Sequence, residues 1–208
     1  MSRLTVAQLL GPLARHRTDE VVVTTMGTAR VVTTMSVVRP WGRLSDSDLD
    51  FASADSAMGH AADLALGVAL ARPERRVVAL NGDGSMLMCL GTLATAVEVG
   101  ARNYVLVVCD NGEYEITGHQ PVAARDRIDW AGLAEAAGFR AVHRFEDARA
   151  WAAAVPRILA EAGPTFVHVL VEPGHEGPIG RSDSEEARYL RHSLADWSRI
   201  VRDALGSP

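Results

Sequence analysis

Two turns that each carry a glycine and a hard oxygen donor follow apolar runs in this chain. Asp83 lies between two glycines in "NGDGS" (81–85), directly after the run "RVVAL". Asn111 lies 28 positions later in "DNGEYEITGHQP" (110–121), after the run "YVLVVC". Glycine permits tight turns and close approach of the backbone to a ligand. Both loops therefore offer a carboxylate or amide oxygen beside a turn that can receive a ligand.

The chemistry that suits these loops is the binding of a divalent cation and a phosphate. A helix that begins near Ser85 would present its positive end and free N–H groups to a phosphate. The carboxylate of Asp83 alone would repel that phosphate. Mg²⁺ resolves the conflict, because it accepts one or two protein oxygens together with phosphate oxygens and water. The amide oxygen of Asn111 is a suitable second donor.

Strand patterns and helix patterns alternate along the chain, and these elements must position the two loops. Helical patterns separate the short β-branched runs, and this alternation predicts an α/β fold, a doubly wound parallel sheet with helices on both faces. The expected strands are 20–25, 76–80, 104–109, 139–145 and 165–171, and the expected helices are 1–16, 56–71, 85–99, 129–137, 147–162 and 184–205. Because ligands bind outside the carboxyl ends of such strands, the two loops should open on one edge of the sheet.

The chain is expected to contain a binding domain and an appendage. Residues 1–175 hold all the expected strands, and residues 176–208 form a tail rich in Gly, Pro and charge that ends in an amphipathic helix. The tail could pack on the core, cover a site or bind a partner.

Composition excludes several classes of protein. All 21 basic residues are arginine, so Schiff-base chemistry and the lysine-bearing phosphate loop are both excluded. A net charge of −5 without a basic stripe argues against nucleic acid, and Arg72, Arg75 and Arg76 are interpreted as a solvated turn. No apolar run approaches the roughly 18 residues of a membrane span. Cys89 and Cys109 lie in apolar runs and are expected to be buried free thiols of a cytoplasmic protein.

The motifs identify a family by resemblance. Gly82-Asp83-Gly84, followed by the pair Asp110-Asn111, resembles the GDG…NN motif of thiamine-diphosphate-dependent enzymes. The stretches "DSAMGHAADLALGVALARPERRVVALNGDGS" and "DNGEYEITGHQP" resemble the cofactor-binding portion of phosphonopyruvate and sulfopyruvate decarboxylases. The resemblance covers about residues 20–175.

This resemblance implies roles for particular residues. It implies that Mg²⁺ is held by the side chains of Asp83 and Asn111 and by the carbonyl of Glu113. Met58 would wedge beneath the cofactor, and His60, His119 and Gln120 would be the catalytic candidates, with His119 suited to proton transfer. The positions implied to bind thiamine diphosphate are Gly27, Thr28, Met58, Gly82, Asp83, Gly84, Ser85, Asn111, Glu113, Tyr114 and Ile116.

Two residues depart from the pattern of the family. Asp110 replaces the first of the paired asparagines, which can alter support of the metal loop. Glu113 is larger and more acidic than the small residue common there, so its side chain must point away from the diphosphate or be paired.

One group that thiamine catalysis needs is missing from the chain. A glutamate that protonates the aminopyrimidine belongs, in the resembled enzymes, to a second domain of similar size. A domain typically takes ~100–150 residues, so this chain has no room for two. The resemblance therefore implies the diphosphate-binding subunit of a heteromeric 2-oxoacid decarboxylase, with a pyrimidine-binding partner subunit. The alternatives are a carboligase subunit similar to acetolactate synthase and a non-catalytic cofactor-binding subunit.

Simpler explanations exist for several of these residues. "GDGSML" is part of a dinucleotide fingerprint, with Asp110 as the ribose-binding acid, although Leu87 stands where the third glycine belongs. Asp83 could be a helix N-cap, and Asn-Gly is a common turn dipeptide. Met58 could be a core residue, and His60 could be an ordinary helix-face histidine.

Two histidines and one arginine lie outside the motif loops. His143 and His168 lie on expected strands and are interpreted as structural. Arg30 could meet an acidic group of a substrate as a bidentate donor.

Overall fold

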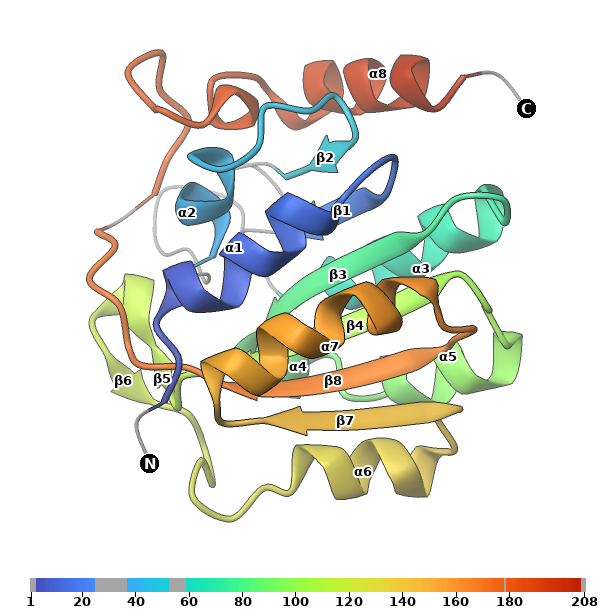
Figure 1. The fold of residues 1–208 in the computed structure, drawn as a ribbon. Helices are drawn as coiled ribbons and strands as arrows, with labels where there is room; N and C mark the ends of the chain where they lie inside the picture. Colours follow the sequence, from blue (N-terminus) through green and yellow to red (C-terminus); the bar gives the residue numbers. More distant parts are fainter. Residues whose placement is uncertain (1–2, 25–36, 53–58, 178, 207–208) are drawn as a thin grey trace.

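The computed structural model describes residues 3–24, 37–52, 59–177 and 179–206. Its centre is a six-stranded sheet in the order β2-β1-β3-β4-β8-β7, and every neighbouring pair is parallel (Figure 1). The strands of this sheet are β1 (Val21–Thr24), β2 (Asp50–Phe51), β3 (Val77–Gly82), β4 (Tyr104–Asp110), β7 (Ala141–Phe145) and β8 (Thr165–Leu170). The predicted α/β fold with a parallel sheet is confirmed.

Helices cover both faces of the sheet. On one face α1 (Val6–His16) and α7 (Ala148–Ala160) lie side by side (Figure 1). They are joined by a hydrogen bond of 2.8 Å from Trp151 Nε1 to the carbonyl of Leu9. On the other side α3 (Ala61–Ala71) contacts α5 (Thr92–Val99), which contacts α6 (Trp130–Ala137). Because both faces are covered, every residue of β1 and of β4 is buried, as their unbroken apolar runs predict.

The register of the two central strands sets the geometry of the site. Gly82, the last residue of β3, pairs with Cys109 near the end of β4. The residues that follow these two strands, Asp83 and Asn111, therefore emerge at the same edge. A small antiparallel pair, β5 (Glu113–Tyr114) and β6 (Gln120–Pro121), folds the loop after β4 back on itself, with the short 3₁₀ helix η1 (Glu115–Thr117) between them.

Some boundaries differ from the prediction. The single helix expected over 85–99 is two helices, α4 (Asp83–Met88) and α5, because the chain turns between Cys89 and Gly91. The tail helix begins later than expected, with the 3₁₀ helix η2 (Arg188–Leu190) before α8 (Leu194–Leu205). The short α2 (Val38–Gly42), β2 and the β5–β6 pair were not expected, since two to five residues carry no periodic signal.

The tail packs beside the edge strand β2. Trp197 of α8 donates from Nε1 to the carbonyl of Asp50, and the Arg188 guanidinium lies over the Trp197 ring, 5.1 Å from its centroid. In the described ranges, no helix has the length and apolar character needed to cross a bilayer.

Candidate cofactor site

The two predicted metal ligands meet in one small cavity at the carboxyl ends of β3 and β4. Asp83 is the first residue of α4 and is 2% exposed, and Asn111 is 6% exposed. Asp83 Oδ2 accepts a hydrogen bond of 3.1 Å from the backbone N–H of Gly112, which ties the two loops together. The cavity is lined by Val37, Gly82, Asp83, Gly84, Ser85, Cys109, Asn111, Glu113, Tyr114 and Glu115.

The suggestion that Asp83 is a helix N-cap is wrong. The N-cap of α4 is Gly82, and no side chain caps this helix. The Asp83 carboxylate instead faces the loop after β4, where a cation that bridges both loops would lie.

The amide of Asn111 is oriented by a residue that the sequence did not single out. Asn111 Nδ2 donates to Glu115 Oε2 at 3.2 Å, and Asn111 Oδ1 accepts from the backbone N–H of Glu113 at 3.0 Å. Glu115 is buried and also accepts from the backbone N–H groups of Gly174 at 2.9 Å and Glu176 at 3.1 Å. Glu115 thus anchors the loop after β4 to the segment that follows β8.

The site is electrostatically unfavourable for anions unless a cation is present. Burial, and then the neighbouring carboxylate of Asp110, raise the pKa of Asp83 to about 7 from its usual 3.8. Asp110 itself accepts a hydrogen bond of 2.8 Å from His168 Nε2 on β8, and both residues are buried. His168 is therefore the partner that accommodates an aspartate at the position where the family has asparagine.

The donor set fits a divalent cation with a diphosphate. Two neighbouring buried carboxylates, Asp83 and Asp110, favour a positive ion beside them. Ser85 Oγ and Asn81 Oδ1 are buried and have no hydrogen-bond partner among the described residues. Buried polar atoms are normally paired, so an unpaired hydroxyl that lines the cavity indicates that a ligand supplies the partner.

The glycine at position 84 is required by the packing of the Tyr114 ring. A Cβ added at Gly84 would lie 2.4 Å from Tyr114 Cε1. We expect Gly84→Ala to displace the ring, to cost about 1–3 kcal/mol of folding stability, and to weaken diphosphate binding. Urea unfolding and cofactor titration measure the two effects, with Gly67→Ala as the matched control because a Cβ at Gly67 meets nothing within 4 Å. Equal behaviour of the two variants would contradict the expectation.

Glu113 and His119 form a pair at the mouth of the site. Glu113 Oε2 is 2.8 Å from His119 Nδ1, and Arg125 approaches its other oxygen at 3.8 Å. The acidic side chain of Glu113 is thus paired, as its departure from the family pattern requires. His119 has a φ of +61°, which is unusual for a non-glycine residue and often marks a functional position.

The remaining predicted residues lie in varied places. Gln120 is exposed and bonds to Thr117, with 2.9 Å from its Nε2 to the Thr117 carbonyl. Ile116 is in the hydrophobic core and does not line the cavity. His60 does not line it either and bonds to Asp63. Gly27, Thr28, Arg30 and Met58 lie outside the described residues.

One of the two cysteines is more exposed than predicted. Both cysteines are free, and Cys109 is buried as expected, but Cys89 is partly exposed because the chain leaves the helix at this residue. The two thiols therefore have different access to solvent.

A family model identifies the class to which the chain belongs. The model described as "Thiamine pyrophosphate enzyme, C-terminal TPP binding domain" matches residues 49–169. The chain belongs to this family of thiamine-diphosphate-binding domains, and the predicted cofactor, thiamine diphosphate with Mg²⁺, is confirmed. The alternative of a dinucleotide site is not supported. Asp110, which would have to bind the ribose, is buried and hydrogen-bonded to His168.

Particular relatives agree with the predicted resemblance. The chain is 38% identical to phosphonopyruvate decarboxylase of Streptomyces viridochromogenes over 189 residues, which cover 89% of this chain and 45% of the relative. It is 42% identical to sulfopyruvate decarboxylase subunit beta of Methanothermobacter thermautotrophicus over 130 residues, which cover 62% of this chain and 66% of the relative. The chain thus spans less than half of the first relative and about two thirds of the second.

A solved structure shows the same fold. The thiamine-diphosphate-dependent 4-hydroxybenzoylformate decarboxylase of Rhodococcus jostii superposes with a TM-score of 0.68 at 23% identity, over 85% of this chain and 34% of that chain.

Proposed function

We propose that the chain is the diphosphate-binding subunit of a heteromeric, thiamine-diphosphate-dependent 2-oxoacid decarboxylase of the sulfopyruvate or phosphonopyruvate type. The observation that carries this proposal is the shared cavity of Asp83 and Asn111 in a chain that is 42% identical to a protein named subunit beta. The two free thiols agree with a cytoplasmic location.

In this function the residues of the chain hold and orient the cofactor. Asp83, Asn111 and the carbonyl of Glu113 would hold Mg²⁺, and Ser85 with the backbone at Gly82 and Gly84 would hold the diphosphate. When bound, thiamine diphosphate supplies the electron sink for loss of carbon dioxide. Tyr114, which lines the cavity, is a further proposed contact of the cofactor, together with Gly27, Thr28 and Met58, which lie outside the described residues. Ile116 is not kept among these contacts, because its side chain packs in the hydrophobic core.

His119 is the proposed proton carrier on this side of the site. Its Nδ1 is 2.8 Å from Glu113 Oε2, so Nε2 is the ring nitrogen that is proposed to transfer the proton. Proton transfer by a positioned histidine typically contributes about 10²–10⁴-fold to a rate. Gln120, two residues beyond the turn at Gly118, is proposed to assist at the edge of the site, whereas His60 is not kept as a catalytic candidate because it does not line the cavity and bonds to Asp63.

The partner would supply what this chain lacks. The glutamate that protonates the aminopyrimidine is proposed to lie on a pyrimidine-binding subunit of similar length, so the catalytic site forms between two polypeptides.

Reconstitution tests the proposal. We expect release of carbon dioxide from sulfopyruvate or phosphonopyruvate only when the chain is mixed with the co-encoded pyrimidine-binding polypeptide, Mg²⁺ and thiamine diphosphate. Turnover by the chain alone would refute the two-subunit arrangement. Accumulation of a condensation product in place of the aldehyde would show carboligation instead.

A variant separates a catalytic from a merely cofactor-binding subunit. In the reconstituted complex, His119→Gln should lower turnover by about 10²-fold or more while cofactor binding, followed by tryptophan fluorescence, is retained. Unchanged turnover would favour the non-catalytic alternative.

A further inference from the structure

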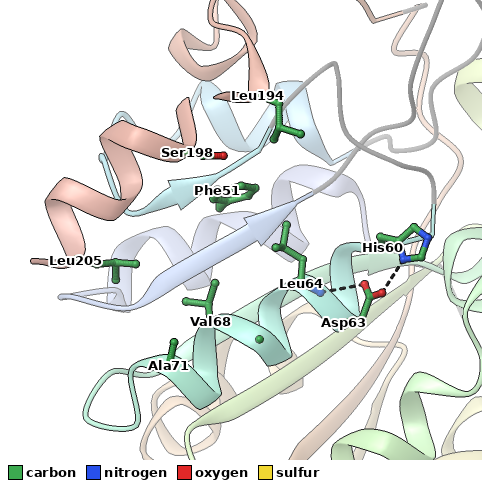
Figure 2. Close-up of a pocket in the computed structure, with 10 residues that line it drawn as sticks. Phe51, His60, Asp63, Leu64, Val68, Ala71, Leu194, Ser198 and Leu205 are labelled. Atoms are coloured by element: carbon green, nitrogen blue, oxygen red, sulfur yellow. Dashed lines mark hydrogen bonds and ion pairs between the residues drawn. The ribbon is translucent and has the colours of Figure 1, made fainter. Parts of the chain in front are cut away.

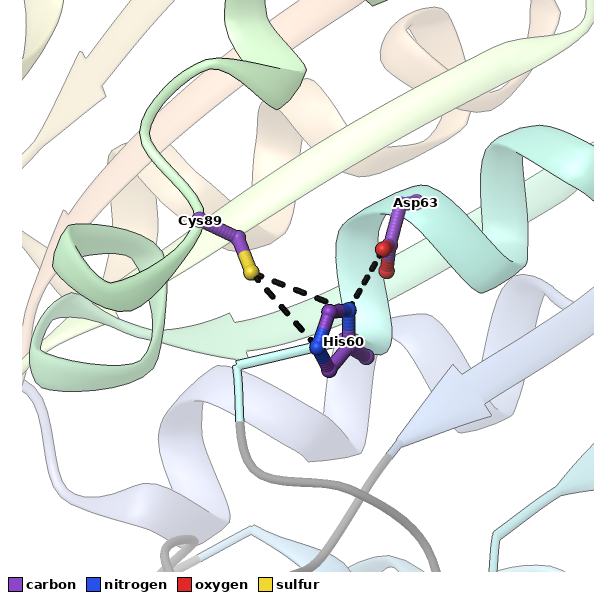
Figure 3. Close-up of side chains that lie close together, drawn as sticks. All are labelled: His60, Asp63 and Cys89. Atoms are coloured by element: carbon purple, nitrogen blue, oxygen red, sulfur yellow. Dashed lines mark hydrogen bonds and ion pairs between the residues drawn. The ribbon is translucent and has the colours of Figure 1, made fainter.

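Three side chains of metal-binding type lie together outside the cofactor cavity. His60 directly precedes α3, Asp63 is in the first turn of α3, and Cys89 directly follows α4. One ligand atom from each lies within 4.8 Å of the other two (Figure 3). None of the three lines the cavity of Asp83 and Asn111.

The backbone brings these side chains together. His60 and Asp63 are three positions apart at the start of a helix, so they share one face, and His60 Nδ1 is 2.6 Å from Asp63 Oδ2. Cys89 Sγ is 3.7 Å from Nδ1 and 4.0 Å from Nε2 of the same ring. Gly59 has a φ of +82°, and a Cβ there would lie 2.8 Å from Met88 Cβ and 3.3 Å from Cys89 Sγ. A glycine is therefore needed for the start of α3 to approach the end of α4.

The donor atoms suit a borderline metal ion. Zn²⁺ binds imidazole nitrogen, carboxylate oxygen and thiolate sulfur, and tetrahedral geometry with its usual bond lengths separates ligand atoms by about 3.3–3.7 Å. The distance from Cys89 Sγ to His60 Nδ1 already fits this range. The distance from His60 Nδ1 to Asp63 Oδ2 must open by less than about 1 Å. Both of these side chains can move, since they are 50% and 41% exposed.

The surroundings leave room for a fourth ligand. His60 and Asp63 lie at one end of an open, largely apolar cavity of about 670 Å³ between α3 and α8 (Figure 2). A metal ion bound to three protein atoms here would remain accessible to water. Three protein ligands with an open position are the arrangement of reactive zinc sites, whereas structural zinc sites have four protein ligands.

The charges at the cluster also favour a cation. Partial burial, and then the carboxylate of Asp63, raise the pKa of the Cys89 thiol above its ordinary value. A bound divalent ion reverses this effect, because it neutralises the carboxylate and stabilises the thiolate. Metal binding should therefore release a proton and tighten as the pH rises.

We propose that His60, Asp63 and Cys89 form a second metal site, which takes Zn²⁺ or a similar borderline ion with water as its fourth ligand. The site differs in chemistry from the Mg²⁺ site, where every protein donor is an oxygen. The assignment does not depend on the decarboxylase function.

Cobalt titration of the full chain tests this site. Co²⁺ bound to a thiolate gives an intense charge-transfer absorption that an all-oxygen site cannot give. We expect one equivalent of this signal, its loss in Cys89→Ser, and its competition by Zn²⁺. We also expect Asp63→Asn to weaken Zn²⁺ binding by about 10- to 100-fold. Asp203→Asn is the matched control, since Asp203 is an exposed carboxylate of α8, and it should bind as the unaltered chain does.

A measurement on the unaltered chain guards against misfolded variants. X-ray absorption of the protein loaded with one equivalent of Zn²⁺ should show one sulfur neighbour at about 2.3 Å. Absence of a thiolate band, a band that persists in Cys89→Ser, or a zinc shell without sulfur would each overturn the proposal.

Discussion

Asp83→Asn is expected to stabilise the metal-free chain and at the same time to abolish Mg²⁺-dependent binding of thiamine diphosphate. Burial and the Asp110 carboxylate raise the pKa of Asp83 to about 7. The folded chain thus binds a proton that the unfolded chain releases near pH 4, so its stability falls as the pH rises from about 4 to about 7. The full difference corresponds to about 4 kcal/mol. Asparagine carries no charge and avoids this penalty, but it also removes the anionic ligand of the ion.

The measurement is urea unfolding between pH 4 and pH 8, with and without Mg²⁺ and thiamine diphosphate. In the unaltered chain the cofactor should restore stability above pH 7, because a ligand that binds only the folded state stabilises it. In Asp83→Asn the curve without cofactor should be flatter, and the cofactor should add nothing. Asp126→Asn is the control, since Asp126 is 81% exposed. A variant that loses stability at pH 8, or that keeps cofactor-dependent stabilisation, would contradict the assignment of Asp83.

The sheet was predictable because its central strands carry a strong signal. The runs at β1, β3 and β4 are apolar at consecutive positions, and β8 is interrupted only by His168, which is typical of strands covered on both faces. The break between α4 and α5 was missed although Gly91 stands at it, because a single glycine inside a helical pattern is often tolerated and does not by itself mark a break. The two-residue strand β2 depends on its pairing with β1 and has no local pattern of its own.

The convergence of the two proposed ligands of the ion was predictable for a different reason. Asp83 and Asn111 each follow a strong strand, and parallel strands bring their carboxyl ends to one edge. Glu115 and His168 were missed as supporting residues because their roles depend on distant parts of the chain. Glu115 accepts from Gly174, 59 positions away, and His168 pairs with Asp110, 58 positions away. Contacts between residues this far apart in the sequence produce no local sequence pattern.

Glu115→Ala is expected to weaken Mg²⁺ and cofactor binding although Glu115 is not a proposed ligand of the ion. The change removes the acceptor of Asn111 Nδ2, so the amide loses the contact that fixes the direction of its oxygen. Loss of such a partner typically lowers metal affinity by 10- to 100-fold, that is, about one to two orders of magnitude. It also leaves the N–H groups of Gly174 and Glu176 without their acceptor. Each of these donors that stays buried should lower the free energy of unfolding by about 1–3 kcal/mol.

The variant Glu115→Gln separates the orientation of the Asn111 amide from the charge of the Glu115 carboxylate. Glu115→Gln keeps one carbonyl oxygen for Asn111 or Gly174 but turns an amide donor toward another donor, so its Mg²⁺ affinity should fall between those of the unaltered chain and Glu115→Ala. Glu172→Ala is the matched control, because Glu172 is an exposed acid of the same segment after β8. Isothermal titration with Mg²⁺ and thiamine diphosphate measures the affinities, and urea unfolding measures the stability. A loss of stability in Glu115→Ala with unchanged Mg²⁺ affinity would show that Glu115 anchors the loop without orienting Asn111.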